Sequence, residues 1–353
     1  MKEVFYTRSR QLLIDLINTP SMSKEEENTA KLIEDFFNDF SIHWKRQGNN
    51  VWALNQHFDP ELPTILLNSH HDTVKPNKGY TRDPFKAGLE EGKIYGLGSN
   101  DAGGCLTMLM ATFAFYYSKS DMPYNLVMLA SAEEENSGEG GIRSVMPVLP
   151  DIDFAIIGEP TKMHLAIAEK GLLVLDCYAY GEAGHAAHRE GDMAIYKAVE
   201  AIKWFENYRP EKMSDTLGAT KLTVTQINAG SQHNVVPAEC HFVVDVRVND
   251  CYSNQEMVDL IQSQVEVEVK PRSLRLNSSS IPADHPIVES GKSLGRTTYG
   301  SPTLSDQSNL SCPSLKLGPG DSLRSHSSDE FITEEELKEG FELYTAILGG
   351  ILN

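Results

Sequence analysis

The sequence lacks any paired-cysteine motif. Its five cysteines are scattered, with no Cys-x-x-Cys pair and no even, closely spaced set of the kind that predicts a disulfide framework. Isolated cysteines are typical of buried free thiols in a reducing compartment. We therefore expect free thiols at Cys105, Cys177, Cys240, Cys251 and Cys312.

Long apolar stretches are also missing. No segment approaches the roughly 18 consecutive apolar residues that a transmembrane helix requires. The N-terminal stretch MKEVFYTRSRQLLIDLINTP mixes charges into a helical pattern and has no apolar centre followed by a small-residue cleavage site. These absences favour a cytoplasmic protein that neither spans nor binds a membrane.

Positive charge is scarce relative to negative charge. Lys and Arg total 31, whereas Asp and Glu total 50, which leaves a formal net charge of −19. A field of this sign repels nucleic acid and anionic lipid, and it favours metal cations or cationic metabolites as partners. The 353 residues are long enough for two domains with a sizeable core.

Two helices are predicted at the start of the chain. Apolar residues recur at helical spacing up to Thr19-Pro20, where proline bars continuation of a helix. Ser23 and Glu26 then predict a capping box. The second helix has a single apolar stripe, formed by Leu32, Ile33, Phe36 and Phe37.

Short apolar runs then alternate with segments of helical length. Residues 64–67, 125–130 and 154–157 predict strands, because each run is bounded by polar or glycine-rich residues. A further helix is expected to begin near Cys105. This rhythm predicts an α/β sheet with several parallel strands.

The pattern changes at about Gly171 and changes back near Asp284, before a last helix over residues 334–352. The intervening segment predicts a smaller α+β unit. Its expected strands are residues 172–180, 221–227 and 241–248, and its expected helices are residues 194–206 and 255–264. We therefore expect a discontinuous α/β domain, residues 1–170 and 282–353, with a mixed, largely parallel sheet and helices on both faces. We expect residues 171–281 to form the inserted α+β domain.

Acidic and histidine residues follow these strands, at the edge where open α/β sheets build their sites. His70 and Asp72 follow the first strand, and in a strand that continues this far their side chains share one face. An imidazole beside a carboxylate that orients it is typical of a metal site. His70 is the candidate ligand, although a His-x-Asp at a strand end is more often structural.

Asp101 lies in a glycine-rich turn, Gly96-Leu97-Gly98-Ser99-Asn100-Asp101-Ala102-Gly103-Gly104. The turn has neither the Lys-Ser/Thr pair nor the Gly-x-Gly-x-x-Gly spacing of a phosphate-binding loop. An aspartate presented by such a turn can bridge two metal ions through its two oxygens.

Three adjacent glutamates, Glu133, Glu134 and Glu135, follow the second strand. They would repel one another unless solvated or neutralised by cations, and a solvated charge run is the commoner explanation of such a triplet. Glu159 follows the third strand, and His326 lies in a loop before the last helix. Each of these features is weak by itself.

Taken in order, the motifs resemble the M20 family of metallopeptidases and deacylases, and they look most like acetylornithine deacetylases. The resemblance extends from about residue 5 to residue 350. One departure is Gly103, where the family often has a lysine. This difference leaves open which subgroup of the family the chain belongs to. The matching motifs are Ser69-His70-x-Asp72-x-Val74, Gly96-x-Gly98-x-x-Asp101, Glu134-Glu135-x-x-Gly138, Gly158-Glu159-Pro160 and Gly318-Pro319-Gly320 followed by His326.

The resemblance implies a role for each matching residue of a two-zinc centre, in which cobalt or manganese can replace zinc. His70 and Glu159 would hold one ion, Glu135 and His326 would hold the other, and Asp101 would bridge them. Glu134 would be the general base, and Asp72 would orient His70. A register shifted by one residue, with Glu133 as the base and Glu134 as a ligand, stays open.

The resemblance also implies functional residues in the inserted domain, which would act as a lid and a homodimer interface. His185 would stabilise the oxyanion of the reaction, and Asn234 and Arg247 would contact the substrate. A guanidinium suits a carboxylate because its planar fork makes two parallel hydrogen bonds. Arg247 could equally pair with an acid in its own sheet.

The implied activity is removal of the acyl group from a small N-acyl amino acid, first N-acetylornithine in arginine biosynthesis. N-succinyl derivatives of ornithine, citrulline or diaminopimelate, N-acetylcitrulline and small peptides remain open as substrates. Two other hypotheses are a non-catalytic binding protein on the same fold and an unrelated acidic α/β protein whose carboxylates are only solvated.

Overall fold

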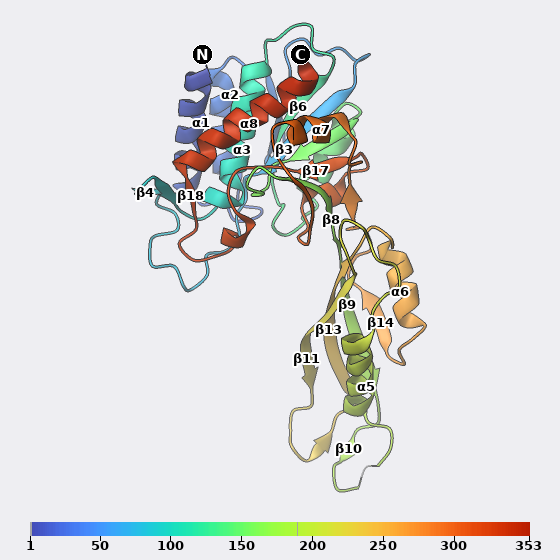
Figure 1. The fold of residues 1–353 in the computed structure, drawn as a ribbon. Helices are drawn as coiled ribbons and strands as arrows, with labels where there is room; N and C mark the ends of the chain where they lie inside the picture. Colours follow the sequence, from blue (N-terminus) through green and yellow to red (C-terminus); the bar gives the residue numbers. More distant parts are fainter. Residues whose placement is uncertain (1, 189) are drawn as a thin grey trace. The chain divides into compact units, whose positions relative to one another are not determined.

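The chain forms two compact units (Figure 1). The computed structural model describes residues 2–188 and 190–353; Met1 and Arg189, which the expected domain ranges include, lie outside the described residues. The first unit comprises the residues up to Ile167 together with Ser280–Tyr299 and Ser305–Asn353, and the second comprises Ala168–Ser279 and Gly300–Leu304. The expected fold class, a discontinuous α/β domain with an inserted α+β domain, is confirmed. The roles of the two domains stay predictions.

A mixed sheet forms the centre of the first unit. Its strand order is β1-β2-β6-β3-β7-β17-β8-β15, and β16 pairs with β8. The four central strands β6, β3, β7 and β17 run parallel to one another. At the two ends of this group, β2 pairs antiparallel with β6 and β8 pairs antiparallel with β17. The strands are β1 Trp44–Gln47, β2 Asn50–Leu54, β3 Thr64–His70, β6 Asn125–Ser131, β7 Phe154–Ile157, β8 Leu165–Glu169, β15 Ser279–Ser280, β16 Thr298–Ser301 and β17 Ser314–Lys316.

Helices cover both faces of this sheet. Its central strands are therefore buried on both sides. Residues of α1, α2, α3, α7 and α8 pack into one core, and residues of α4 pack into a second core. The helices are α1 Lys2–Ile17, α2 Glu27–Asp39, η1 Ser99–Gly103, α3 Gly104–Tyr116, α4 Ile142–Val145, η2 Met146–Val148, α7 Pro286–Ser293, η3 Asp306–Asn309, η4 Ser322–Arg324 and α8 Glu334–Leu352.

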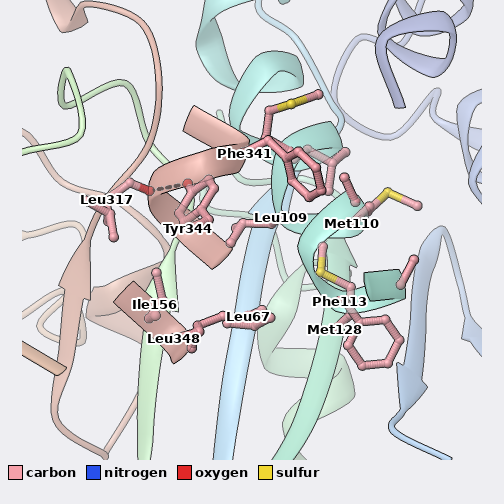
Figure 2. Close-up of a cluster of buried hydrophobic side chains, with 14 of the residues drawn as sticks. Leu67, Leu109, Met110, Phe113, Met128, Ile156, Leu317, Phe341, Tyr344 and Leu348 are labelled. Carbon is pink, nitrogen blue, oxygen red and sulfur yellow. Dashed lines mark hydrogen bonds between the residues drawn. The ribbon is translucent and has the colours of Figure 1, made fainter. Parts of the chain in front are cut away.

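Alternate side chains of one strand enter different cores, as the two-residue period of a strand requires. Leu67 of β3 lies in the larger core, whereas its neighbour Leu66 lies in the smaller one. Figure 2 shows Leu67, Met128 and Ile156, from three adjacent strands, in the larger core with residues of α3 and α8. This packing holds the parallel strands, and therefore the residues that follow them, in a fixed register.

The predicted capping box at Ser23 and Glu26 is wrong. Neither side chain caps α2, whose N-cap has no side-chain hydrogen bond. The Ser23 hydroxyl instead donates to the Asp72 carboxylate at 2.7 Å, and the fully buried Glu26 carboxylate accepts the backbone N–H groups of Lys24 and Glu133 at 2.7 and 3.2 Å. Both side chains therefore contact the segments that carry the predicted site.

The last helix, α8, begins at Glu334 and ends at Leu352, as predicted. A capping box of Thr333 and Glu336 begins it. Just before it, β18 (Phe331–Thr333) joins a three-stranded antiparallel sheet with β5 (Lys93–Tyr95) and β4 (Gly88–Glu90). The pairing of β5 with β18 holds the strand that precedes Asp101 beside the strand that follows His326.

The second unit is an antiparallel sheet with two helices on one face. The sheet order is β11-β13-β9-β14, and the predicted strands and helices are all present. A separate pair, β10 and β12, forms a short ladder in the same unit. The elements are β9 Gly171–Tyr180, β10 Gly184–His185, α5 Ala194–Asn207, β11 Lys221–Ala229, β12 Val235–Val236, β13 Glu239–Val248, α6 Asn254–Gln262 and β14 Glu268–Pro271.

The five cysteines are free, as predicted. In the part of the chain that the structure describes, no helix combines the length and the hydrophobicity of a membrane span.

Candidate metal centre

The carboxyl ends of parallel strands place the first group of predicted site residues. His70 is the last residue of β3, Glu134 and Glu135 follow β6, and Glu159 follows β7. Because β6, β3 and β7 are adjacent and parallel, these ends meet at one edge of the sheet. Three stretches that lie far apart in sequence therefore converge.

Asp101 lies between two histidines. Its Oδ1 is 3.5 Å from His70 Nε2, and its Oδ2 is 3.7 Å from His326 Nε2. Each of its oxygens thus faces a different imidazole. The structure brings together both of the predicted ligand sets that share Asp101.

Two groups of three potential ligands share this aspartate. One is His70, Asp101 and Glu159, and the other is Asp101, Glu135 and His326; within each group the candidate ligand atoms lie within 4.8 Å of one another. Nitrogen and carboxylate oxygen donors without thiolate suit zinc, manganese or cobalt. The donor set therefore fits two divalent cations that share one carboxylate.

The hydrogen bond at Nδ1 of His70 favours the neutral tautomer that can bind a cation through Nε2. His70 Nδ1 lies 3.0 Å from the backbone carbonyl oxygen of Asp72 and 3.4 Å from its carboxylate Oδ1. An N–H at Nδ1 donates to the carbonyl and leaves the lone pair of Nε2 facing Asp101. Asp72 thus contacts His70 mainly through its backbone rather than through the carboxylate that the sequence pattern suggested.

The Asp72 carboxylate holds the glutamate turn instead. It accepts the backbone N–H of Glu134 at 3.0 Å and that of Glu135 at 3.1 Å. It is 1% exposed, and Ser23 also donates to it. A buried acid therefore fixes the backbone of the turn that carries two of the predicted site residues.

The neighbours Glu133 and Glu134 occupy different surroundings. Glu134 Oε2 is 4.0 Å from His70 Nε2, whereas Glu133 Oε2 accepts the backbone N–H of Gly140 at 3.4 Å. Glu133 has a left-handed backbone with φ of 53°, which reverses the chain at this point. The geometry brings Glu134 and Glu135, but not Glu133, toward the histidines.

Burial and neighbouring charges favour the protonated forms of several groups in this cluster. Burial, with the Asp101 carboxylate nearby, raises the pKa of Glu159 to about 8, and burial also raises the pKa of Glu134 well above its usual range. The Glu135 carboxylate raises the pKa of His326 to about 9. Burial opposes charge on His70, but Asp101 and Asp72 outweigh it and raise the pKa of the imidazole. Cations in place of these protons would relieve the crowding of buried acids.

Comparison with known proteins identifies the family. The model of the peptidase family M20/M25/M40 matches residues 66–349, which include all five candidate ligands. The chain belongs to this family. The resemblance expected from the sequence motifs is therefore confirmed.

Relatives within the M20 family include acetylornithine deacetylases. The enzyme of Proteus mirabilis is 31% identical over 289 residues, covering 76% of this chain and 74% of the relative. The enzyme of Shigella sonnei is 28% identical and covers 94% of this chain and 95% of the relative. These names support an enzyme related to deacetylases of the M20 family.

Solved M20-like structures share the fold. A tripeptidase from Staphylococcus aureus has a TM-score of 0.77 at 21% identity, with 97% of each chain covered. The Bacillus subtilis YXEP protein, described as a dinuclear metal-binding peptidase of the M20 family, has a TM-score of 0.72 at 16% identity, with 99% of each chain covered. At these identities the likeness concerns the fold.

The remaining predicted residues lie in the second unit. His185 pairs with Val235 in the β10–β12 ladder, and the backbone carbonyl of Asn234 accepts the N–H of Ala186 at 3.0 Å. His185 and Asn234 are therefore brought close together by the pairing of two short strands that lie far apart in sequence. Their proposed contacts with substrate stay predictions.

Arg247 pairs with an acid in its own sheet. Its Nε and Nη2 donate to the two carboxylate oxygens of Asp245 at 2.8 and 3.0 Å. The Arg247 side chain as a whole is 33% exposed. The alternative pairing considered from the sequence is thus present, and the predicted contact of Arg247 with substrate stays a prediction.

Two buried acids near the candidate metal centre were not predicted from the sequence. Glu330 is 1% exposed, and Asp306, which is 3% exposed, accepts hydrogen bonds from Asn68 and Ser131 at 3.0 and 2.7 Å. Glu330 stands four residues after His326 in a polar loop, and Asp306 follows Ser305 in a serine-rich one. No periodicity marks either residue as buried, since both are enclosed by segments distant in sequence.

Pro160, the residue after Glu159, lines a cavity of about 340 Å³. Its volume lies within the range of small-molecule sites. Tyr299 lines it, and burial, with Glu159 and Asp321 nearby, raises the pKa of this phenol to about 12, so the hydroxyl stays a hydrogen-bond donor at neutral pH. The other lining residues are Thr161, Lys162, His164, Thr297, Asp321 and Ser322.

Proposed function

We propose that this M20-family protein is a two-metal amidohydrolase that removes the acyl group from a small N-acyl amino acid, with N-acetylornithine as the first candidate. The observation that carries the proposal is the placement of Asp101, whose two oxygens face His70 and His326. The acetylornithine deacetylases among the relatives support the substrate class, and they make arginine biosynthesis the favoured pathway.

His70, Asp101 and Glu159 would hold one cation, and Asp101, Glu135 and His326 would hold the other. The dinuclear description of the Bacillus subtilis relative in fold supports two ions. Zinc is favoured by the donor set, with cobalt or manganese as replacements. Two such ions would lower the pKa of a water molecule and polarise the amide carbonyl of the substrate.

Glu134 would act as the general base. It belongs to neither candidate ligand group, and its Oε2 lies 4.0 Å from His70 Nε2. A buried carboxylate with a raised pKa can accept the proton of the attacking water and then give it to the leaving amine. The Asp72 carboxylate would keep Glu134 in place through its backbone N–H.

The second unit would supply substrate contacts and a homodimer interface. His185 would stabilise the oxyanion, and Asn234 with Arg247 would bind the carboxylate end of the amino acid. The formal net charge of −19 favours a substrate whose side chain is cationic, as that of ornithine is. A neutral or acidic side chain would gain nothing from this field.

An assay with the purified protein and added zinc or cobalt tests the proposal. The panel contains N-acetylornithine, N-acetylcitrulline, N-succinylornithine, N-succinyl-diaminopimelate and a dipeptide and a tripeptide. We expect the fastest turnover with N-acetylornithine. Turnover of peptides alone would reassign the protein as a peptidase, and metal binding without turnover of any compound would refute the deacylase assignment.

A further inference from the structure

The Glu330 carboxylate lies where three backbone N–H groups of the Asp101 turn converge. Its Oε1 accepts from Asn100 at 2.8 Å and from Asp101 at 2.9 Å, and its Oε2 lies within hydrogen-bond distance of the N–H of Gly98 at 3.2 Å. Its own backbone carbonyl accepts the N–H of Gly96 at 2.9 Å. One residue therefore binds backbone N–H groups at four positions of this turn.

The turn needs such a partner because its backbone departs from regular structure. Gly98 is left-handed, with φ of 76°, and Asp101 has φ of −120° and ψ of 97° within η1. Buried N–H groups without a partner cost free energy. A single acid, itself 1% exposed, satisfies three of them, as an anion does in a concave arrangement of backbone amides.

Glu330 also joins two ligand-bearing segments. It lies four residues after His326 and directly before β18, while the turn that it binds carries Asp101. The chain entering this turn is held to the same region by the pairing of β5 with β18. A displacement of Glu330 would therefore move Asp101 relative to His326.

We infer that Glu330 is a positioning residue that sets the orientation of Asp101, so that each carboxylate oxygen faces one cation subsite. The inference rests on the proposed two-metal function. Glu330 does not belong to either candidate ligand group and acts through Asp101. Because Asp101 is common to both subsites, loss of Glu330 weakens the binding of both cations.

The Asp72 carboxylate provides a useful contrast. It holds the N–H groups of Glu134 and Glu135 in the same manner, but Glu135 belongs to only one ligand group. The turns that carry Asp101 and Glu135 are thus each held by a buried acid. The acid that holds the turn of the shared ligand is Glu330.

Titration of the metal-free full chain with Co²⁺, followed by its visible absorption, tests this inference. The wild type should bind two Co²⁺ per chain. Glu330→Ala should weaken both binding events by about ten- to a hundredfold, the range expected when a partner of a metal ligand is lost. Glu330→Gln should weaken them less, because its amide oxygen still accepts from Asn100 and Asp101 while its NH₂ faces the donor of Gly98.

Asp153→Asn is the matched control. The Asp153 carboxylate also accepts a backbone N–H, that of Thr64 at 2.7 Å, but at the opposite end of β3 from His70. This variant should keep the Co²⁺ affinity and absorption of the wild type. Thermal unfolding of each variant in EDTA reports any general loss of stability separately.

The outcomes separate the inference from the function on which it rests. Co²⁺ affinities and spectra of both Glu330 variants equal to those of the wild type would overturn the positioning role, whatever their stability in EDTA. Weakening of one binding event alone would also overturn it, since the two subsites share Asp101. A wild type that binds no Co²⁺ would instead overturn the metal centre itself.

Discussion

Glu133 and Glu134 are adjacent in sequence, yet only the Glu134 carboxylate approaches the histidine cluster, with Oε2 4.0 Å from His70 Nε2. Glu133 Oε2 contacts the backbone N–H of Gly140 in its own turn, at 3.4 Å. The left-handed backbone at Glu133 separates the two side chains. The structure therefore favours the register in which Glu134 is the base and Glu135 the ligand.

Replacing the proposed base should abolish turnover but not metal binding. Glu134→Gln removes the group that accepts the proton, and we expect kcat to fall by about 10² to 10⁴. Metal content, measured by elemental analysis, should stay at the wild-type value. Glu133→Gln is the control and should keep kcat within a few-fold; the reverse ranking of the two variants would establish the shifted register.

Removal of metal should destabilise the protein. Cations that bind only the folded state stabilise it by about 2.7 kcal/mol at a concentration of 100 Kd. EDTA should therefore lower the Tm by about 5 °C or more, and zinc should restore it. Asp101→Asn, which alters the shared ligand, should make the Tm nearly insensitive to EDTA. An equal response of the variant and the wild type would contradict the bridging assignment.

Loss of Arg247 should affect substrate binding more than the chemical step. Charge-assisted hydrogen bonds contribute about 1.5 to 3 kcal/mol, so Arg247→Gln should raise KM about tenfold or more. Steady-state kinetics with N-acetylornithine measures this. Arg272→Gln, which removes an arginine paired with Asp176 in the same sheet, is the control and should leave KM unchanged. Equal KM values for all three proteins would show that Arg247 serves only its pair with Asp245.

The ion pairs of Asp176 predict a pH-dependent contribution to stability. Arg272, and then His241, lower the pKa of Asp176 from 3.8 to about 2. A carboxyl with a lowered folded-state pKa stabilises the protein above pH 3.8, and this contribution is lost as the pH falls toward 2. Asp176→Asn should therefore unfold about 2 °C below the wild type at pH 5, since solvent screens the pairs, and the gap should close near pH 2.

Thermal scans of the metal-free proteins at pH 5, 3 and 2 measure this gap. Asp250→Asn, at an exposed position of the same unit, serves as the control and should show no gap at any pH. A gap for Asp176→Asn that widens as the pH falls would reverse the predicted sign.

The Tyr344 hydroxyl should contribute measurably to the larger core. The side chain is fully buried and donates to the backbone carbonyl of Leu317 (Figure 2). Tyr344→Phe leaves that buried carbonyl without its partner and should lower the free energy of unfolding by about 1 to 3 kcal/mol. Urea unfolding measures the change. Tyr196→Phe, at a side chain that is 66% exposed, should change it by less than about 0.5 kcal/mol.

Local pattern was sufficient to predict most of the fold. The strands that carry His70, Glu134 and Glu159 were predicted because continuous apolar runs bounded by polar residues are typical of strands buried on both faces. The last helix was predicted at its observed bounds. The same reasoning failed at Ser23 and Glu26, which have the spacing of a capping box. Ser23 instead donates a hydrogen bond to Asp72, and Glu26 accepts one from the backbone of Glu133.

The sequence by itself determined which residue types stand at the carboxyl ends of the strands, because burial period and strand length are local properties of the chain. Only the tertiary structure decided how they act together: that Asp101 faces both His70 and His326, and that Glu330 holds the Asp101 turn. These side-chain contacts join residues separated by 31 to 232 positions. Their partners depend on the register of packed strands and on the course of loops, which no local periodicity encodes.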